Sequence, residues 1–381
     1  MTPSAPDAPP RPLRIVHVVD SLEVGGLERV TVDLAQAQAA LGHDVRVFSI
    51  AATEGLKKEL LDAGIPVTEG HKRRSLDWHT LSLLRACVRD ARADVVHAHN
   101  FVPNYHAALA TIGLGVAQVC TLHDMGARLQ NRRLKTLFQL SLARTHGVAM
   151  VGTQVHQRHV ASGLVPADKA HTVLNGIPVS RFAEGSSSKS TARQQLGLND
   201  TDLVIGCVGR LVPLKNHHRM VDVMPALLQQ HPHLRLVIVG DGVQAEALRQ
   251  QVVAKGLQEH VVLAGQRSHV SALLGAFDVF ALPSQTEGLS IALLEACATG
   301  LAVVATRVGG NPEIIVDDQT GLLIAPDDND ALAGALSRML ADSALRARLG
   351  AAAAQWVRAH ASSDALAQAY GRVYDTALIK R

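Results

Sequence analysis

Two carboxylates, Glu287 and Glu295, lie eight positions apart in a stretch that directly follows an apolar run at residues 278–284. The pattern predicts a strand followed by a helix that begins near Glu287, and eight steps along a helix span about 12 Å. A sugar ring and a ribose joined by a diphosphate are separated by a similar length, so each carboxylate would hold hydroxyl groups at one end of such a ligand. Between them, backbone N–H groups at the positive end of the helix would favour phosphate, and they belong to Gly288, Leu289 and Ser290.

Two cations, Arg210 and Lys215, follow another apolar run, where we expect a strand to turn into a helix that begins at Asn216. Both side chains can then point into one crevice. No acidic residue lies near them in the sequence, and two buried cations without a counter-ion would be costly. A phosphate group is the natural counter-ion, and a pair of cations on an exposed surface is the alternative.

These elements resemble retaining glycosyltransferases of the GT-B fold, specifically glycosyltransferase family 4, whose signature is two Glu separated by seven residues. The element that carries Arg210 and Lys215 is similar to the family's Gly-Arg-Leu…Lys element. The resemblance runs from about residue 13 to residue 375 and is more specific in the carboxyl half. Further stretches similar to family landmarks follow in the family's order, at residues 24–29, 121–124, 237–242, 262–265, 308–313 and 320–323.

The resemblance implies a role for each candidate. Glu295 would bind the ribose hydroxyls, Glu287 would contact the donor sugar, and Arg210 and Lys215 would hold the diphosphate. His123, which ends an apolar run, would meet the donor sugar and be important for catalysis. Each has a plain alternative, which is a solvated helix acid for Glu295, a helix cap for Glu287 and a structural histidine for His123.

Other candidates lie in the amino half. Gly25 and Gly26 follow the first expected strand and would let the donor or acceptor approach the backbone closely, although a simple turn explains them as well. We expect His97 and His99 to face opposite ways at the end of a strand, with His99 and Asn100 on the acceptor side. Asp124 is a candidate only because it follows His123.

The sequence favours neither a metal nor a redox cofactor. The His-x-His pattern invites a metal interpretation, but no clustered Asp or Glu accompanies it and no Asp-x-Asp element stands in a suitable setting. We therefore expect metal-independent chemistry. No Gly-x-Gly-x-x-Gly follows an expected strand, which argues against a nicotinamide or flavin cofactor.

Composition bounds the class of protein. A chain of 381 residues predicts two domains, and its 47% hydrophobic content is globular. With no run of 18 apolar residues and no signal-peptide pattern at the start, we expect a soluble cytoplasmic protein. A net charge of +3 is too small to indicate nucleic acid. Four scattered cysteines, which indicate buried thiols, are Cys87, Cys120, Cys207 and Cys297.

A basic amphipathic pattern at about residues 128–144 has two interpretations. It combines Arg128, Arg132, Arg133 and Lys135 with several leucines and Phe138. Such a helix can rest on an anionic membrane, which would place the protein peripherally on the inner face of the cell membrane. Packing on a sheet with a solvated basic face is equally compatible with the pattern.

Short runs rich in Val and Ile alternate with helical patterns along the whole chain, which indicates parallel sheets covered by helices. The expected strands of the amino half are residues 13–19, 45–50, 95–99, 116–123, 148–152 and 171–174. Those of the carboxyl half are residues 203–209, 234–240, 261–264, 279–282, 302–306 and 322–324. The fold class is therefore α/β, with two Rossmann-like, doubly wound parallel-sheet domains whose ligand-binding edges face an interdomain cleft.

The Ser-rich stretch at 184–191 predicts a linker, with a boundary near residue 185. We expect a disordered tail at 1–12, which holds five prolines, an acceptor-side domain at 13–184 and a nucleotide-sugar domain at 185–361. Ala-rich helical patterns cover 330–349 and 351–379. The resemblance implies that the last helix, about 362–379, crosses back onto the first domain.

The function implied by the resemblance is transfer of a hexose from a UDP- or GDP-sugar to an acceptor hydroxyl with retained anomeric configuration. The acceptor would be a glycan or a lipid-linked sugar, as in bacterial cell-surface polysaccharide or lipid-linked oligosaccharide assembly. Two rivals stay open: a nucleotide-sugar 2-epimerase on the same fold, and a catalytically silent carbohydrate-binding subunit.

Overall fold

The computed structural model describes residues 11–52, 54–73, 77–123, 131–184, 189–267 and 270–381. The chain forms two compact units. The first comprises Met1–Val151, His156–Val173 and Leu366–Arg381, and the second comprises Gly152–Val155 and Leu174–Ala365.

The first unit contains a seven-stranded parallel sheet in the order β3-β2-β1-β4-β5-β6-β7. Its strands are β1 (Arg14–Val19), β2 (Asp44–Ser49), β3 (Val67–Glu69), β4 (Val95–His99), β5 (Ala117–Leu122), β6 (Gly147–Met150) and β7 (Ala170–Thr172). The intervening helices are α1 (Gly26–Ala40), α2 (Lys57–Asp62), α3 (Trp78–Asp90), α4 (Phe101–Ala110), α5 (Arg132–Ser141) and α6 (Thr153–Ala161).

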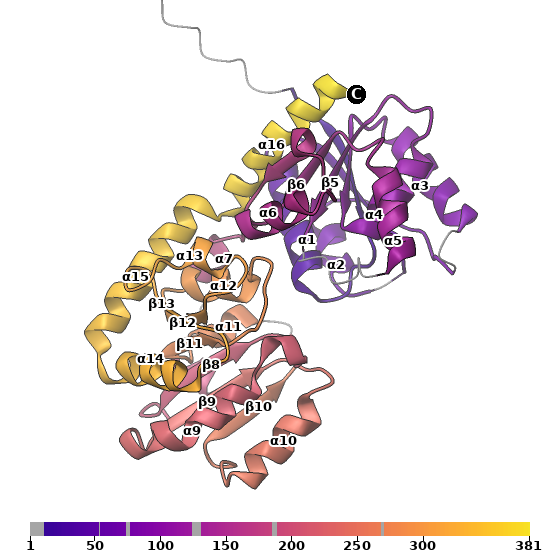
Figure 1. The fold of residues 1–381 in the computed structure, drawn as a ribbon. Coiled ribbons are helices and arrows are strands. Elements are labelled where there is room, and N and C mark those ends of the chain that lie inside the picture. Colours follow the sequence, from indigo (N-terminus) through magenta and orange to yellow (C-terminus); the bar gives the residue numbers. More distant parts are fainter. Residues whose placement is uncertain (1–10, 53, 74–76, 124–130, 185–188, 268–269) are drawn as a thin grey trace, which may run out of the picture. The chain divides into compact units, whose positions relative to one another are not determined.

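The C-terminal helix α16 (Ser363–Lys380), drawn in yellow in Figure 1, packs against this first sheet. Two of its side chains reach the strands: Tyr370 meets Thr121 of β5, and Tyr374 meets His97 of β4. Both tyrosines are 1% exposed. The end of the chain therefore completes the core of the unit that the start of the chain begins.

The second unit contains a six-stranded parallel sheet in the order β10-β9-β8-β11-β12-β13. Its strands are β8 (Leu203–Val208), β9 (Leu234–Val239), β10 (Val261–Gly265), β11 (Val279–Leu282), β12 (Ala302–Thr306) and β13 (Leu322–Ile324). Its helices are α7 (Ser180–Glu184), α8 (Lys189–Gln195), α9 (His218–Gln230), α10 (Ala245–Ala254), α11 (Val270–Leu274), α12 (Ile291–Ala298), α13 (Asn311–Ile314), α14 (Asn329–Ala341) and α15 (Ser343–His360).

The central strands are covered on both faces, as their Val- and Ile-rich sequences require. All residues of β4, β5, β11 and β12 are buried. The prediction of two parallel sheets flanked by helices is confirmed, and every strand expected from the sequence is present.

Away from the candidate site, the structure corrects the secondary-structure prediction in two places. Strand β3 was not expected, because its three residues, Val-Thr-Glu, are too few to show a period and form a half-buried edge. The C-terminal helices do not break near Gly350, where the two predicted helical patterns meet. Gly350 lies inside α15, where a Cβ would overlap the backbone oxygen of Gly300. One break falls at Asp342, whose carboxylate accepts a hydrogen bond from the N–H of Leu345 and caps α15. A second break separates α15, which ends at His360, from α16, which begins at Ser363.

Several predictions fall on residues outside the described ranges. These are most of the expected tail (1–10), the boundary near residue 185 within 185–188, Asp124, and residues 128–130 of the basic helix. The part of that helix that the structure describes is α5. In the described ranges, no helix combines the length and the apolar character needed to cross a membrane.

Candidate functional site

The carboxyl ends of β8 and β11 carry a largely buried charged group. These strands are neighbours at the point where the strand order reverses, which is where open α/β sheets bind their ligands. From the loop after β8, Lys215 Nζ donates to Glu287 at 2.6 Å (Oε1) and 2.8 Å (Oε2). From the loop after β11, Ser284 Oγ donates to Glu287 Oε1 at 2.6 Å.

No acid lies near the two cations in the sequence, but the fold supplies one to Lys215. Glu287 is 72 positions from Lys215 in sequence and is brought next to it by the sheet order. The Glu287 side chain is 7% exposed and that of Lys215 is 22% exposed, so the pair is largely removed from water. Arg210 differs: it is exposed, and its guanidinium makes no ion pair or hydrogen bond with any residue that the structure describes.

The helix after β11 starts later than predicted. α12 begins at Ile291, and Ser290 is its N-cap, with Ser290 Oγ accepting a hydrogen bond from the N–H of Leu293 at 3.3 Å. Glu287 therefore lies in the loop, and the helical distance of about 12 Å between the two carboxylates does not apply. Gly288 and Leu289 also belong to the loop. Glu295 lies within α12 and is half-buried.

The turn after β8 likewise differs from the prediction. Pro213–Lys215 form a short 3₁₀ turn, Asn216 adopts a left-handed conformation with a φ of 61°, and α9 begins only at His218. Asn216 therefore does not start the helix. Its left-handed backbone redirects the chain directly after Lys215.

Two glycines in the loop after β12 allow it to lie against the backbone of the loop after β11. Gly309, after β12, has a φ of 52°, and a Cβ there would overlap the backbone oxygen of Glu287. The next residue, Gly310, donates its N–H to the backbone oxygen of Gly288 at 2.7 Å. Only a residue without a side chain permits this approach with a left-handed backbone. Sequence analysis placed Gly309 in a landmark without a role, and it missed Ser284 altogether, because a lone serine carries no pattern.

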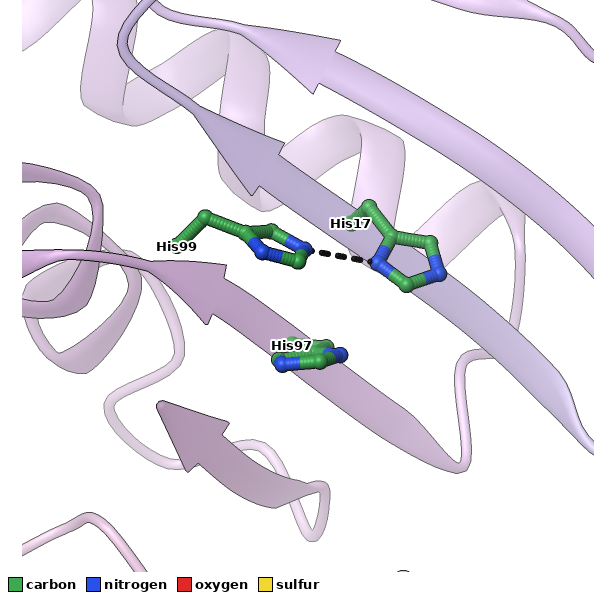
Figure 2. Close-up of side chains that lie close together, drawn as sticks. All are labelled: His17, His97 and His99. Atoms are coloured by element: carbon green, nitrogen blue, oxygen red, sulfur yellow. Dashed lines mark hydrogen bonds between the residues drawn. The ribbon is translucent and has the colours of Figure 1, made fainter. Parts of the chain in front are cut away.

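The first unit holds a chain of histidines at the carboxyl edge of β1, β4 and β5. His123 Nε2 lies 3.1 Å from His99 Nδ1, and His99 Nε2 lies 3.0 Å from His17 Nδ1. Figure 2 shows the rings of His17, His97 and His99 close together, with the bond between His17 and His99 dashed. His17, His97 and His99 are at most 1% exposed, and His123 is half-buried.

The same network continues through α1 and α16. His17 Nε2 lies 2.8 Å from Gln38 Oε1, and Gln38 Nε2 donates to the Tyr374 hydroxyl at 3.0 Å. That hydroxyl lies 2.8 Å from His97 Nδ1, and His97 Nε2 lies 2.7 Å from Thr121 Oγ1. The predicted opposite orientation of His97 and His99 is therefore wrong. Residues two apart on a strand share one face, and the ring centroids of these two lie 4.3 Å apart.

Burial keeps these histidines neutral. It lowers the pKa of His17 to about 4 and that of His123 to about 3. The pKa values of His97 and His99 are also held well below the ordinary value, first by burial and then by neighbouring histidines. At neutral pH each ring therefore carries one N–H donor and one acceptor nitrogen.

Asn100 supports His123 from a strained position. Its φ of 72° and ψ of −174° lie where residues other than glycine are uncommon. Its Oδ1 accepts a hydrogen bond from the backbone N–H of His123 at 2.9 Å. Asn100 thus holds the end of β5 in place, whereas His99 is buried with both ring nitrogens already bonded to histidines.

His17, His97 and His99 are also close enough to share a metal ion, since one nitrogen from each lies within 4.8 Å of the others. All six of their ring nitrogens take part in protein hydrogen bonds. A metal ion would have to replace several of these bonds, and no carboxylate of the described chain joins the cluster.

The remaining candidates lie elsewhere in the first unit. Gly25 has an extended backbone with a φ of −157°, which any residue adopts, and Gly26 is the first residue of α1. In α5, Phe138 is buried against Phe101 at a centroid distance of 5.0 Å, while Leu140 is 68% exposed. The three cations of α5, Arg132, Arg133 and Lys135, are exposed.

The cysteines form no functional cluster. All four are buried and unpaired by disulfides, as predicted. Burial raises the pKa of the Cys297 thiol to about 12, so this group stays protonated and inert at neutral pH.

Comparison with known protein families shows which family this chain belongs to. A family model described as "Glycosyltransferase Family 4" matches residues 24–181, and one described as "Glycosyl transferases group 1" matches residues 188–356. This chain is a family 4 glycosyltransferase. Its predicted family is thereby confirmed.

Two curated relatives of this glycosyltransferase illustrate the range of the family. It is 35% identical over 207 residues to the GDP-mannose-dependent alpha-(1-6)-phosphatidylinositol monomannoside mannosyltransferase of Mycolicibacterium smegmatis, a match that spans 51% of this chain and 53% of that protein. It is 29% identical over 393 residues to the D-inositol 3-phosphate glycosyltransferase of Actinosynnema mirum, which covers 93% of both chains.

Among solved structures, the glycosyltransferase is similar to HepE of Anabaena, crystallised in complex with UDP and glucose. The TM-score is 0.83 at 22% identity, with 94% of this chain and 98% of that chain covered. At this identity the likeness concerns the fold, and it confirms the predicted GT-B-like fold class.

Proposed function

We propose that this glycosyltransferase transfers a hexose from a UDP- or GDP-sugar to an acceptor hydroxyl, with retention of the anomeric configuration. The observation that carries the proposal is the group formed by Lys215, Glu287 and Ser284 at the switch point of the second sheet, beside the start of α12. At this edge a carboxylate receives hydrogen bonds from a lysine ammonium, which donates to both of its oxygens, and from a serine hydroxyl. Such a group suits a ligand that has both hydroxyl groups, which a carboxylate binds, and phosphate groups, which an ammonium binds.

The donor diphosphate would bind to Arg210, to Lys215 and to the amino end of α12. Negative charge develops on the diphosphate as the glycosidic bond breaks, and fixed positive groups aimed at that charge stabilise the transition state. Gly288, Leu289 and Ser290 would contribute the loop that leads into the helix. Lys215 is shared with Glu287 in this arrangement, so a bound phosphate would join an existing pair.

The carboxylates would fix the sugar and the nucleoside. Glu287, held by Lys215 and Ser284, keeps acceptor capacity for sugar hydroxyls, and Glu295 would accept hydrogen bonds from the ribose. In the favoured family mechanism the acceptor attacks from the leaving-group face, and a phosphate oxygen takes its proton. We expect no metal requirement, which turnover in the presence of excess EDTA would test.

In the first unit, we propose that His123 meets the donor sugar and that Gly25 and Gly26 allow a ligand to approach the backbone. We keep Asn100 as an acceptor-side candidate. His99 would serve that side through its hydrogen bond to His123, because its own ring nitrogens are occupied.

The experiment is a donor screen with product analysis. The protein is incubated with UDP-glucose, UDP-N-acetylglucosamine and GDP-mannose, with and without glycan and inositol-lipid acceptors, and products are followed by mass spectrometry and NMR. We expect one donor to release its nucleoside diphosphate and to form an α-linked product. An epimerised donor without transfer would indicate the epimerase, and no binding of any donor would favour the silent subunit.

We also propose a lipid-linked acceptor reached at the cytoplasmic face of a membrane. The supporting observation is that exposed Arg132, Arg133 and Lys135 lie on the same short helix as exposed Leu140. Co-sedimentation with anionic vesicles and not with neutral ones is expected. Equal recovery with both would remove this part of the proposal.

A further inference from the structure

The buried polar network of the first unit extends from the half-buried His123 to helices α1 and α16. Its hydrogen bonds run in one unbranched series from His123 through His99 and His17 to Gln38, and then to Tyr374. The series leads from the half-buried His123 to residues that are at most 1% exposed.

Neutral histidines make such a series directional. Each neutral ring has one N–H donor and one acceptor nitrogen, so the role of one ring dictates the role of the next. The burial of these rings, which lowers their pKa values to about 4 for His17 and about 3 for His123, excludes the doubly protonated form at neutral pH.

The direction follows from the Gln38 amide. Its Nε2 donates to the Tyr374 hydroxyl, so its Oε1, which can only accept, faces His17 Nε2. His17 must then carry its proton on Nε2 and accept on Nδ1. His99 consequently donates from Nε2 and accepts on Nδ1, and His123 donates from Nε2.

We infer that Gln38 is a positioning residue that fixes His123 in the Nε2–H tautomer, leaving Nδ1 of His123 as a hydrogen-bond acceptor for a ligand hydroxyl. Within the described chain, Nδ1 of His123 has no hydrogen-bond partner. The first unit would thereby select a ligand group that donates a hydrogen bond. The residue that sets this preference would be a glutamine in α1 that does not touch the ligand. The ligand contact of His123 rests on the proposed function, but the tautomer does not.

The opposite arrangement is equally definite. If the Gln38 amide were turned over, its NH₂ group would donate to His17 Nε2, and every bond of the series would reverse. His123 would then be an Nδ1–H donor and would select an acceptor group on the ligand. The two arrangements differ in the tautomer of each histidine in the series and are distinguishable by measurement.

The test is long-range ¹H–¹⁵N NMR of the full chain labelled with ¹⁵N-histidine at pH 7.5, a spectrum that reports which ring nitrogen is protonated. Resonances are assigned with His17→Asn and His123→Asn. We expect His17, His99 and His123 each in the Nε2–H form. Nδ1–H forms, or a mixture at His123, would overturn the inference. This wild-type spectrum decides the tautomer whether or not any donor binds, so its outcome is separate from that of the proposed function.

Variants test the role of Gln38. Gln38→Leu removes the anchor, and we expect His123 to become a mixture of tautomers. Gln118→Leu is the matched control, because Gln118 is also a glutamine of the first unit that is 1% exposed, but it bonds to Asn104 and lies outside the series.

With an active donor, Gln38→Leu should raise KM about tenfold with a smaller effect on kcat, as expected for one lost acceptor. If Gln118→Leu also produced a mixture of His123 tautomers and the same rise in KM, a role specific to Gln38 would be contradicted.

Discussion

At the scale of single residues, the most informative contact is the one between Lys215 and Glu287. Sequence analysis found no acidic partner for Lys215, whereas in the structure Lys215 forms an ion pair with the carboxylate of Glu287. The two side chains are now dependent on each other, since a largely buried carboxylate that loses its cation keeps only Ser284 as a donor. We therefore expect the loss of either side chain to affect folding as well as binding of the proposed donor.

Lys215→Ala should lower turnover by orders of magnitude and destabilise the second unit by about 1–3 kcal/mol, because Glu287 remains buried with one donor. Thermal unfolding and a transfer assay measure the two effects. Lys189→Ala is the control: Lys189 is half-exposed and its partner Asp278 keeps Arg193, so little change is expected. Wild-type turnover and melting temperature in Lys215→Ala would refute the assignment.

At the scale of elements, the sequence predicted strands better than it predicted helix starts. The strands of the second sheet are apolar runs with sharp ends, so their bounds follow from composition. The start of α12 depends on Ser290 capping Leu293, and Glu287, three residues earlier, looked like an equally good beginning. The ion pair between loops, and Gly309 against Glu287, depend on tertiary contacts that no local pattern shows.

Gly309→Ala should reduce nucleotide binding, because the new Cβ would displace the loop that carries Glu287. Gly300→Ala is a matched control with a φ of 78° and no atom within 4 Å of the new Cβ. It should cost only the backbone strain, about 1 kcal/mol, and leave binding unchanged. Calorimetric titration with UDP and GDP separates the two variants, and equal affinity in both would disprove the role of Gly309.

Tyr374→Phe should destabilise the first unit by about 1–3 kcal/mol, because Gln38 Nε2 and His97 Nδ1 would both lose a buried partner. Tyr370→Phe serves as the comparison. Its hydroxyl bonds to Thr121, which retains His97, so the expected loss is smaller. Denaturant unfolding measures both, and the reverse order of stability would contradict the assigned network.

At the scale of the whole molecule, the chain order explains what the sequence could and could not reveal. Alternating βα patterns predicted two parallel sheets. The strand order reverses between β8 and β11 and between β1 and β4, and the loops after these strands lie where open α/β sheets commonly bind ligands. The histidine network escaped prediction because its members come from β1, α1, β4, β5 and α16. His17 and Tyr374, which are far apart in sequence, meet Gln38 only after α16 has packed on the first unit.

Acid should unfold the first unit well above the pH at which carboxylates titrate. Below the ordinary histidine pKa of 6.5, the unfolded chain binds protons that buried His17, with a pKa of about 4, does not bind. Stability is therefore present above pH 6.5 and lost as the pH falls toward 4, by about 1.4 kcal/mol per pH unit for each histidine that stays neutral.

Melting temperatures between pH 7.5 and pH 5 measure this dependence. His79→Gln removes an exposed histidine of the same unit and should leave the steepness unchanged. A first unit that is as stable at pH 5 as at pH 7.5 would show that the buried histidines accept protons in the folded state.

The measurement that tests the central claim most directly is calorimetric titration of UDP and GDP into the wild-type protein, Arg210→Ala and Arg249→Ala. We expect one nucleotide to bind the wild type and to bind Arg210→Ala at least about tenfold more weakly, since Arg210 is an exposed cation in the loop after β8 that also carries Lys215. Arg249→Ala, which removes an exposed cation of α10, should bind like the wild type. Binding of neither nucleotide to the wild type, or wild-type affinity in Arg210→Ala, would contradict a donor diphosphate at this edge of the second sheet.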